Sequence, residues 1–415
     1  MQQLELIIRR TRLEGHEGLF DIGVAEGRTV RIAEHIETEA ENELDAEGRL
    51  ASPAFVEPHI HLDKVGVRPL LPPNASGTLA EAIELMHRTK RVATAEQVAE
   101  RAGQAIRQAV LAGTTTIRTH VDVDTVGGLT PLKGVLHARL EHADICDIQT
   151  VAFPQEGIER QPGTREAMRA AMQAGADVVG GMPHWERNRD AARRHIDFCL
   201  DLAVEHDADI DMHIDESDDP DSRTLELLID ATEARGWGSR VTASHCCAMA
   251  AWDDSYAAEI IGRAAEVDIN VIVNPCTNLL LQGRMDSEPR RRGIPRVKEL
   301  LAAGVRMGCG QDCVNDAFYP FGVPDQLQVA LILAHAAQLS TPEEIAVALQ
   351  MVRSQAAQIL RISNYGLHEG ALADLMILDA ERMEDALRFQ AVRRWVLHGG
   401  EIVAETHHEQ TLHHR

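Results

Sequence analysis

The stretch Phe55-Val-Glu-Pro-His-Ile-His-Leu-Asp63 decides the fold. His59 and His61 stand two residues apart at the end of an expected β-strand. Alternate side chains of a strand lie on the same face, so both imidazoles can bind one metal ion. Alone, a His-x-His pair is a weak signal, because two polar residues on a hydrated strand face look the same. The pair gains weight because later expected strands also end in histidine or a carboxylate.

Apolar runs alternate with helical patterns through the middle of the chain, which is typical of parallel strands joined by helices. The expected strands are Leu50–Val56, Thr115–Val121, Asp147–Phe153, Asp177–Met182, Asp209–His213, Arg240–Ser244, Asp268–Val273 and Val305–Gly308. The expected helices are Leu79–Arg91, Ala95–Ala112, Arg165–Ala174, Arg193–His206 and Ser222–Arg235. Eight strands predict a closed (β/α)₈ barrel of the TIM type over residues 51–365. An open doubly wound sheet is less favoured, because no Gly-x-Gly-x-x-Gly follows the first strand.

Short strand-like runs stand at both ends of the chain. Leu4–Arg9 and Thr29–Ala33 precede the barrel, and Ala373–Asp379 follows it. Gly399-Gly400 separates two further apolar runs, which is a hairpin signal. Residues 1–50 and 366–415 are therefore predicted to form one small β-sandwich domain.

Composition excludes some classes of partner. The 415 residues carry a formal net charge of −24, whereas a nucleic-acid polymer or an anionic membrane is bound through basic patches. The seven cysteines form no Cys-x-x-Cys pair, which predicts reduced thiols. The sequence shows no signal-peptide pattern and no apolar run of ~20 residues. We expect a cytoplasmic enzyme whose partner is a small molecule.

Each expected barrel strand ends in a polar or reactive side chain, and barrels place their chemistry at these carboxyl ends. The side chains are His59, His61, His120, Asp122, Asp124, Gln155, Glu156, His184, His213, Glu216, His245, Asn274 and Asp312. A single polar residue after a strand is unremarkable, since loops are polar. Here such side chains follow every expected barrel strand, and most of these strand ends carry a histidine. This pattern indicates one shared site.

His59, His61, His213 and Asp312 supply three imidazoles and one carboxylate. This mixed set suits one Fe(II) or Zn(II) ion, because Ca(II) and Mg(II) prefer shells of oxygen alone. Taken singly, His213 reads as a satisfied core histidine and Asp312 as a turn residue. Glu216 follows His213 by three residues, where its carboxylate can face the water at the metal.

These motifs together resemble the bacterial cytosine deaminases, of the amidohydrolase superfamily, over essentially the whole chain. The resemblance is carried by Phe55–Asp63, Arg118-Thr-His-Val-Asp-Val123, Val151-Ala-Phe-Pro-Gln-Glu-Gly157, His213-Ile-Asp-Glu216, Val241-Thr-Ala-Ser-His245 and Leu281-Gln-Gly283. Binuclear relatives bridge two metals with a carboxylated lysine on the fourth strand. The segment Asp177–His184 has no lysine, so the resemblance implies one metal ion.

By resemblance, the metal ligands are His59, His61, His213 and Asp312. Glu216 would carry a proton to ring N3, with Asp312 or Glu216 taking the proton of the water, and His245 would hydrogen-bond that water. Gln155 would bind the carbonyl and the ring N–H edge of a pyrimidine. Leu79, Phe153 and Phe318 would wall the base. The resemblance also implies a homohexamer.

The chain departs from the cytosine deaminase pattern in its pocket. Cys313 stands where the family has a second Asp near C5 of the base; Phe318 replaces a usual Trp and Gln311 a usual His. A lone cysteine is often a small space-filling residue. Loss of a carboxylate nonetheless leaves room for an apolar C5 substituent, so Cys313 is predicted to be substrate-binding.

The predicted activity is hydrolysis of cytosine to uracil, and of 5-methylcytosine to thymine, with release of ammonia. Deamination of another small heterocycle, such as isoguanine or creatinine, stays open on the same scaffold. A cyclic amidase such as dihydroorotase is disfavoured by the missing lysine. A non-catalytic metal-binding protein would have no need of Glu216 and Gln155.

Overall fold

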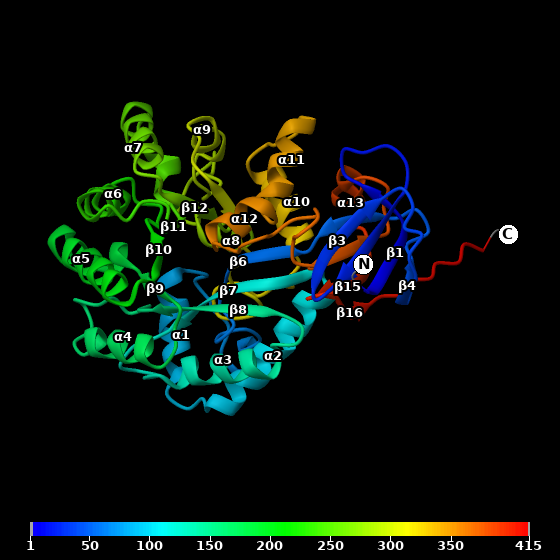
Figure 1. The fold of residues 1–415 in the computed structure, drawn as a ribbon. Helices are drawn as coiled ribbons and strands as arrows, with labels where there is room; N and C mark the ends of the chain where they lie inside the picture. The colour runs from blue at the N-terminus through cyan, green and yellow to red at the C-terminus, as the bar shows by residue number, and fades with distance from the viewer. Residues whose placement is uncertain (1–2, 414–415) are drawn as a thin grey trace.

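The protein is described here by a computed structural model that covers residues 3–413. Within these residues, eight parallel strands form a barrel sheet in sequential order, with helices around its outside (Figure 1). The strands are β6 (Phe55–Ile60), β7 (Thr114–Asp122), β8 (Asp147–Phe153), β9 (Val178–Gly181), β10 (Asp209–Ile214), β11 (Val241–His245), β12 (Asn270–Val273) and β13 (Met307–Cys309). The predicted barrel is confirmed.

One or two helices connect most successive barrel strands, and others follow β13. They are α1 (Leu79–Lys90), α2 (Ala95–Leu111), α3 (Thr130–Glu141), α4 (Thr164–Gln173), α5 (Arg189–His206), α6 (Thr224–Arg235), α7 (Asp254–Glu266), α8 (Pro275–Leu281), α9 (Val297–Ala302), α10 (Gln326–Ala336), α11 (Pro342–Gln350), α12 (Ser354–Ile359) and α13 (Met383–Phe389). Helices α10–α12 follow β13, and α13 lies between two strands of a second sheet. Short 3₁₀ turns occupy Arg68–Leu70, Pro183–Trp185 and Cys247–Ala251. Helix α2 shows why such segments are helical. Thr94 and Gln97 form a capping box at its start, and Val98, Ile106 and Val110 bury one face.

Closure of the barrel brings its first and last strands together at the carboxyl end. Ile60 bridges to Asp312, just beyond β13. The Asp312 N–H donates to the His59 carbonyl at 2.8 Å, and the His61 N–H donates to the Asp312 carbonyl at 3.2 Å. Ordinary backbone pairing therefore places residues 59, 61 and 312 side by side, although more than two hundred residues of chain separate them.

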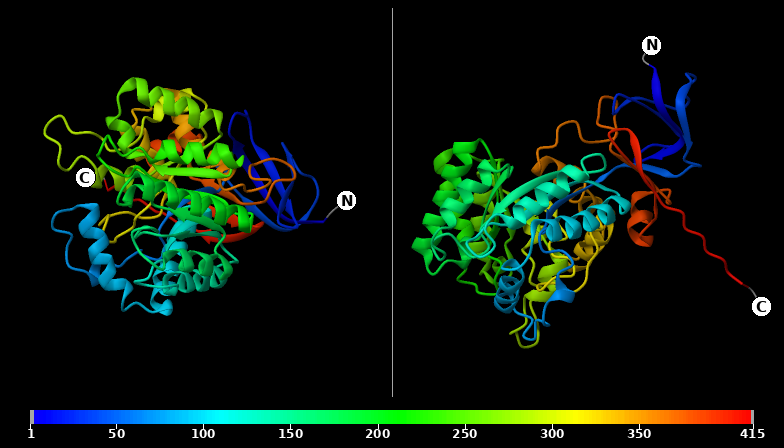
Figure 2. Two further views of the ribbon diagram at one scale, coloured as in Figure 1. Left: turned by 90° about the vertical axis from the view of Figure 1, so that its left-hand side faces the viewer. Right: turned by 90° about the horizontal axis from the view of Figure 1, so that it is seen from below.

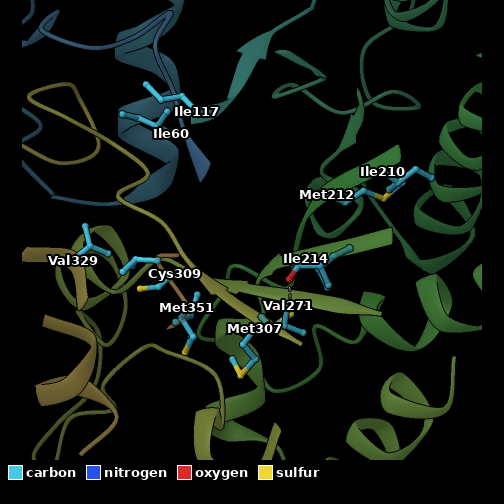
Figure 3. Packing of buried hydrophobic residues seen from close by; sticks show 14 of the residues in the cluster. Ile60, Ile117, Ile210, Met212, Ile214, Val271, Met307, Cys309, Val329 and Met351 are labelled. Carbon is cyan, nitrogen blue, oxygen red and sulfur yellow. Dashed lines mark hydrogen bonds between the residues drawn. The ribbon is translucent and has the colours of Figure 1, made fainter. Parts of the chain in front are cut away.

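Aliphatic and sulfur-containing side chains fill the space between the barrel and its helices. Ile210 and Met212 of β10 and Met307 of β13 are fully buried there (Figure 3). Met351, which follows α11, packs in the same cluster, and its carbonyl accepts a hydrogen bond from the N–H of Cys309 at 3.0 Å. This core holds the strand ends rigidly, which is what a catalytic site on a barrel needs.

Both chain ends contribute to a second sheet beside the barrel (Figures 1 and 2). Its strands are β1 (Leu4–Leu13), β2 (Phe20–Ala25), β3 (Arg28–Ala33), β4 (Ala40–Asp45), β5 (Leu50–Pro53), β14 (Leu375–Leu378), β15 (Arg393–His398) and β16 (Glu401–Glu405). Most pairs are antiparallel, and β1 runs parallel to β4 and β5. Its own apolar cluster joins Ile8 and Ile22 from one chain end to Ile377 and Leu397 from the other. The predicted small β-sandwich from the two termini is confirmed.

One expected element is corrected. The run Leu50–Val56 is not a single barrel strand: Leu50–Pro53 is β5, which pairs with β14 in the terminal sheet, whereas the barrel strand begins at Phe55. Both halves are apolar because both are buried, and hydrophobicity alone cannot separate them. We still propose that residues 1–50 with 366–415 form one domain and 51–365 the other, with β5 at the boundary. Residues 1–2 and 414–415 of that division lie outside the described range.

The helices differ from those that span a bilayer. Across residues 3–413, none combines the length and the apolar character needed to cross a membrane.

Candidate active site

Four predicted metal ligands converge at the carboxyl end of the barrel. His61 Nε2 lies 3.2 Å from His213 Nε2 and 3.3 Å from Asp312 Oδ1. His59 Nε2 lies 3.6 Å from the same Asp312 oxygen. All four side chains are buried, with at most 3% of each residue exposed. These side chains come from β6, β10 and the segment after β13.

The spacing of these donor atoms fits a divalent metal ion. Tetrahedral bonds of ~2.0–2.2 Å place neighbouring donors ~3.4 Å apart, and the observed separations are 3.2, 3.3 and 3.6 Å. His59 Nε2 is buried without a hydrogen-bond partner among the described residues. The Nε2 atoms of His61 and His213 also face each other, and a cation bound by both would explain this close approach.

The protonation states suit metal binding. Burial lowers the pKa of His61 to about 3 and holds the pKa of His213 well below its usual value. Burial alone would raise the pKa of Asp312, but the neighbouring imidazoles of His59 and His61 hold it well below its usual range. Neutral imidazoles and an ionised carboxylate are the forms that ligate a metal.

A second layer of side chains orients His59, one of the four predicted ligands. Its Nδ1 lies 3.0 Å from Ser244 Oγ, which in turn donates to Asp211 Oδ1 at 2.7 Å. Metal-ligating histidines generally bind a carboxylate or another acceptor through the second ring nitrogen, which fixes the tautomer. Ser244 and Asp211 perform that task here.

Glu216 is held beside the four donors by Asn278. The Asn278 amide donates from Nδ2 to Glu216 Oε1 at 2.9 Å and lies, through Oδ1, 3.1 Å from His245 Nδ1. An amide oxygen only accepts, so His245 carries its Nδ1 proton toward Asn278. Burial raises the pKa of Glu216 to about 7. A carboxyl that titrates near neutral pH is suited to both accepting and delivering a proton.

A small cavity of about 250 Å³ opens beside Asp312 and Glu216. It is lined by His61, Lys64, Leu79, Gln155, His213, Glu216, Thr277, Leu281, Asp312, Cys313 and Phe318. The structure thus brings the predicted wall residues Leu79, Gln155, Cys313 and Phe318 together with three of the predicted metal ligands. Phe153 differs, because it lies one layer behind and stacks on the His213 ring at 4.1 Å between centroids.

The sequence analysis missed Lys64, Thr277 and Asn278. Lys64 is 1% exposed, and its Nζ donates to Gln155 Oε1 at 2.7 Å and lies 2.8 Å from Asp122 Oδ1. Burial acts to lower the Lys64 pKa, but nearby carboxylates, first Asp122, raise it overall. The one signal in the sequence was that Lys64 directly follows the segment Phe55–Asp63.

Two site residues have backbones in the left-handed region. Asp312 has φ of 66° and His245 of 74°. Residues other than glycine seldom adopt such angles, and when they do they cluster at functional sites. His245 ends β11 and Asp312 lies just beyond β13, where the chain enters a loop.

Gly310 is required for the approach of β6 to the last strand. A Cβ atom there would lie 2.7 Å from His59 Cβ and 2.8 Å from the His59 carbonyl oxygen. We expect Gly310→Ala to displace His59, lowering stability by about 1–3 kcal/mol and weakening metal binding. Thermal unfolding and metal titration measure both effects.

Gly262 on helix α7 is the matched control, because a Cβ there meets nothing within 4 Å. Gly262→Ala should be neutral or stabilise by up to about 1 kcal/mol. Unchanged stability and metal affinity in Gly310→Ala would contradict the close approach.

Comparison with known proteins places this site among hydrolases. Residues 42–404 match the model of the Amidohydrolase family. The crystal structure of 5-methylcytosine deaminase from Klebsiella pneumoniae, liganded with 5-fluorocytosine, is similar with a TM-score of 0.94 and 39% identity, covering 98% of this chain and 99% of that one.

Two curated relatives have different substrates in their names. N-isopropylammelide isopropyl amidohydrolase from Pseudomonas sp. (strain ADP) is 33% identical over 411 residues, which are 97% of this chain and 98% of that protein. Pterin deaminase from Rhizobium rhizogenes is 30% identical over 395 residues, 93% of this chain and 89% of the relative. The relatives share hydrolysis of a C–N bond on a heterocycle and differ in the ring.

Proposed function

The chain belongs to the amidohydrolase family and hydrolyses C–N bonds of heterocycles; from this premise we propose that it deaminates a free aminopyrimidine. The substrates would be 5-methylcytosine, giving thymine, and cytosine, giving uracil, with release of ammonia. The observation that carries the proposal is the placing of Glu216, Gln155 and an apolar wall around one small cavity beside the metal donors.

The cavity is small, with an empty space of about 250 Å³ that includes its opening to solvent. We therefore propose a substrate of a single small ring rather than a nucleoside or nucleotide. The similarity to a 5-methylcytosine deaminase over 98% of this chain supports the same size class.

His59, His61, His213 and Asp312 would hold one Fe(II) or Zn(II) ion. When bound, such an ion lowers the pKa of water to about 7, so that hydroxide forms near neutral pH. Three pairs of their donor atoms lie 3.2, 3.3 and 3.6 Å apart, and the set mixes nitrogen with one oxygen.

Proton transfer is assigned to Glu216. Its carboxyl group delivers a proton to ring N3, which makes C4 electrophilic toward water; His245 orients that water. As the new C–O bond forms at C4, Asp312 or Glu216 takes one proton from the water, and this proton passes to the amine nitrogen. The C4–N bond then breaks to release ammonia, and the C4 hydroxyl returns its proton to Glu216, which leaves a carbonyl at C4 and a proton on N3. Asn278 keeps the Glu216 carboxylate and the His245 ring in register throughout, through hydrogen bonds of 2.9 and 3.1 Å.

Preference for a C5 methyl group is proposed from the wall around Cys313. This residue is 4% exposed and packs in one apolar cluster with Leu281 and Phe318, and Leu79 packs against that cluster. A carboxylate at this position would place its negative charge against an apolar substituent at C5. The neutral thiol leaves an apolar surface that suits a methyl group.

We expect Cys313→Asp to reverse the preference between the two bases. Because a methyl contact in an apolar pocket is worth ~10- to 200-fold in kcat/KM, the ratio for 5-methylcytosine over cytosine should fall by about that factor. The control Cys313→Ala keeps the wall uncharged and should retain the preference. The parent protein rejecting 5-methylcytosine as strongly as Cys313→Asp does would refute the methyl pocket.

Ammonia release from a panel of free heterocycles tests the function itself. Metal-loaded protein is assayed with 5-methylcytosine, cytosine, isoguanine, creatinine and a pterin. The highest kcat/KM should belong to 5-methylcytosine or cytosine. Activity confined to the other rings would replace the proposed substrate and leave the deaminase class in place.

A second candidate is hydrolysis of an alkylamino group from an oxo-triazine. It is favoured by the 33% identity to N-isopropylammelide isopropyl amidohydrolase across 97% of this chain. Release of isopropylamine from N-isopropylammelide, measured beside ammonia in the same panel, separates the two.

A further inference from the structure

We propose that Lys64 is a specificity-determining residue that binds the ring oxo group of the substrate and sets the orientation of the Gln155 amide. This inference rests on the proposed function and names what the cavity selects: a neutral azine that bears a carbonyl beside its reacting amidine. The sequence analysis gave Lys64 no role.

The position of Lys64 is built by buried contacts. Its Nζ lies 2.7 Å from Gln155 Oε1 and 2.8 Å from Asp122 Oδ1, and the side chain lines the cavity. The ammonium also lies 5.4 Å from the ring centroid of Phe153 and 5.2 Å from that of Phe318. Aromatic faces attract a cation and hold it in place without taking its hydrogen atoms.

Two consequences follow from counting donors. An ammonium has three N–H donors and no acceptor; Gln155 and Asp122 account for two, which leaves one for a ligand in the cavity. Because Lys64 can only donate, the amide oxygen of Gln155 must face it, and the flip of this amide is settled. The Gln155 NH₂ group then lies 3.2 Å from Met182 Sδ, a weak acceptor that a substrate carbonyl can easily outcompete.

The lysine and the amide therefore present N–H donors to the same end of the cavity. A substrate satisfies them with a carbonyl oxygen, and a ring that lacks this oxygen leaves one buried N–H of the Lys64 ammonium without an acceptor. Sites built in this way reject the analogue much more strongly than apolar pockets reject a missing methyl group. The oxo group, in this view, is selected more strictly than the C5 substituent.

The surrounding charges indicate a neutral ligand. Lys90 Nζ lies 2.5 Å from Asp122 Oδ2, 2.7 Å from Asp124 and 3.1 Å from Glu156. These three carboxylates outnumber the two ammonium groups, so the network holds no surplus positive charge for an anionic substrate. A polar but uncharged oxygen meets the one remaining Lys64 donor without disturbing this balance.

The experiment compares two product-like ligands, of which the second lacks the C2 oxygen and, with it, the N1–H. Dissociation constants of thymine and of 5-methylpyrimidin-4-one, which lacks the C2 oxo group, are measured by calorimetry on metal-loaded protein. Hydrogen bonds to charged groups predict that the parent binds thymine about 10- to 100-fold more tightly. In Lys64→Met, which keeps the length of the side chain, the two constants should come within a few-fold of each other.

Lys90→Met is the matched control. It removes an ammonium from the same carboxylates but from a side chain that does not line the cavity. Its preference for thymine should equal that of the parent. If losing a buried lysine had only a general structural effect, both variants would bind both ligands more weakly and by the same factor.

Lys64→Arg provides a charge-retaining variant in case Lys64→Met folds poorly, and it should recover part of the preference for thymine. Equal weakening of both ligands in Lys64→Met, while 5-methylcytosine is still deaminated by the parent, would overturn the role of Lys64 alone. A parent that neither binds thymine nor deaminates a pyrimidine would overturn the proposed function, and this inference with it.

Discussion

Glu216→Gln is expected to lower kcat by about 10²- to 10⁴-fold, the usual worth of one proton-transfer group. Glutamine keeps the size of the side chain and can still bond to Asn278, which lies 2.9 Å from Glu216 Oε1. It cannot deliver a proton to ring N3. Glu216 is not among the four donors, so the variant should hold as much metal as the parent.

Steady-state kinetics with 5-methylcytosine and elemental analysis of the same samples measure the two effects together. Glu226→Gln is a suitable control, because that carboxylate forms a partly exposed pair with Arg189 on the outside of the barrel. It should leave both kcat and metal content unchanged. Full activity in Glu216→Gln would contradict the shuttle role, and loss of metal would reassign Glu216 as a ligand.

Removal of the metal should have an effect of several orders of magnitude. Without an ion to lower the pKa of water from about 15.7 to about 7, little hydroxide forms at neutral pH. Four buried donor groups would also remain close together without a shared cation, so unfolding should begin at a lower temperature. Dialysis against a chelator, followed by addition of Fe(II) or Zn(II), measures the loss and the recovery of ammonia release.

His213→Ala is the paired variant for this test. It removes one donor, whose Nε2 lies 3.2 Å from that of His61, and returned metal should not restore its activity. The ion that gives the parent its higher kcat/KM identifies the better metal for catalysis. Undiminished deamination by metal-free protein would contradict the proposal that catalysis requires the metal ion.

Much of the barrel was predictable because it rests on local patterns. The run Thr115–Val121 and the helix Ala95–Ala112 lie within a few residues of β7 and α2. Helix α3 was not predicted, since Pro131 at its start and Gly134 within it weaken the helical pattern. The division of Leu50–Val56 between two sheets was also not predictable, because the pairing partner β14 lies at the other end of the chain.

The metal donors could be predicted for a different reason. A barrel places all strand ends on one rim, so residues such as His213 and Asp312 needed only to be found after a strand. The residues that position these side chains could not be predicted, because they act through contacts across the barrel. Asn278 bridges Glu216 and His245, and Lys64 reaches Gln155 and Asp122; no spacing in the sequence encodes these pairs.

Anomalous diffraction from metal-loaded crystals tests the central claim most directly. The account predicts one strong peak within ~2.0–2.2 Å of the donor atoms of His59, His61, His213 and Asp312. Among the described residues, His245 also lies close enough to His59, His213 and Asp312 to share an ion with them, and two further groups of candidate donors exist: His59 with His120 and Asp211, and Asp147 with Asp374 and His398. A principal peak at either of them, or none at the four predicted donors, would contradict it.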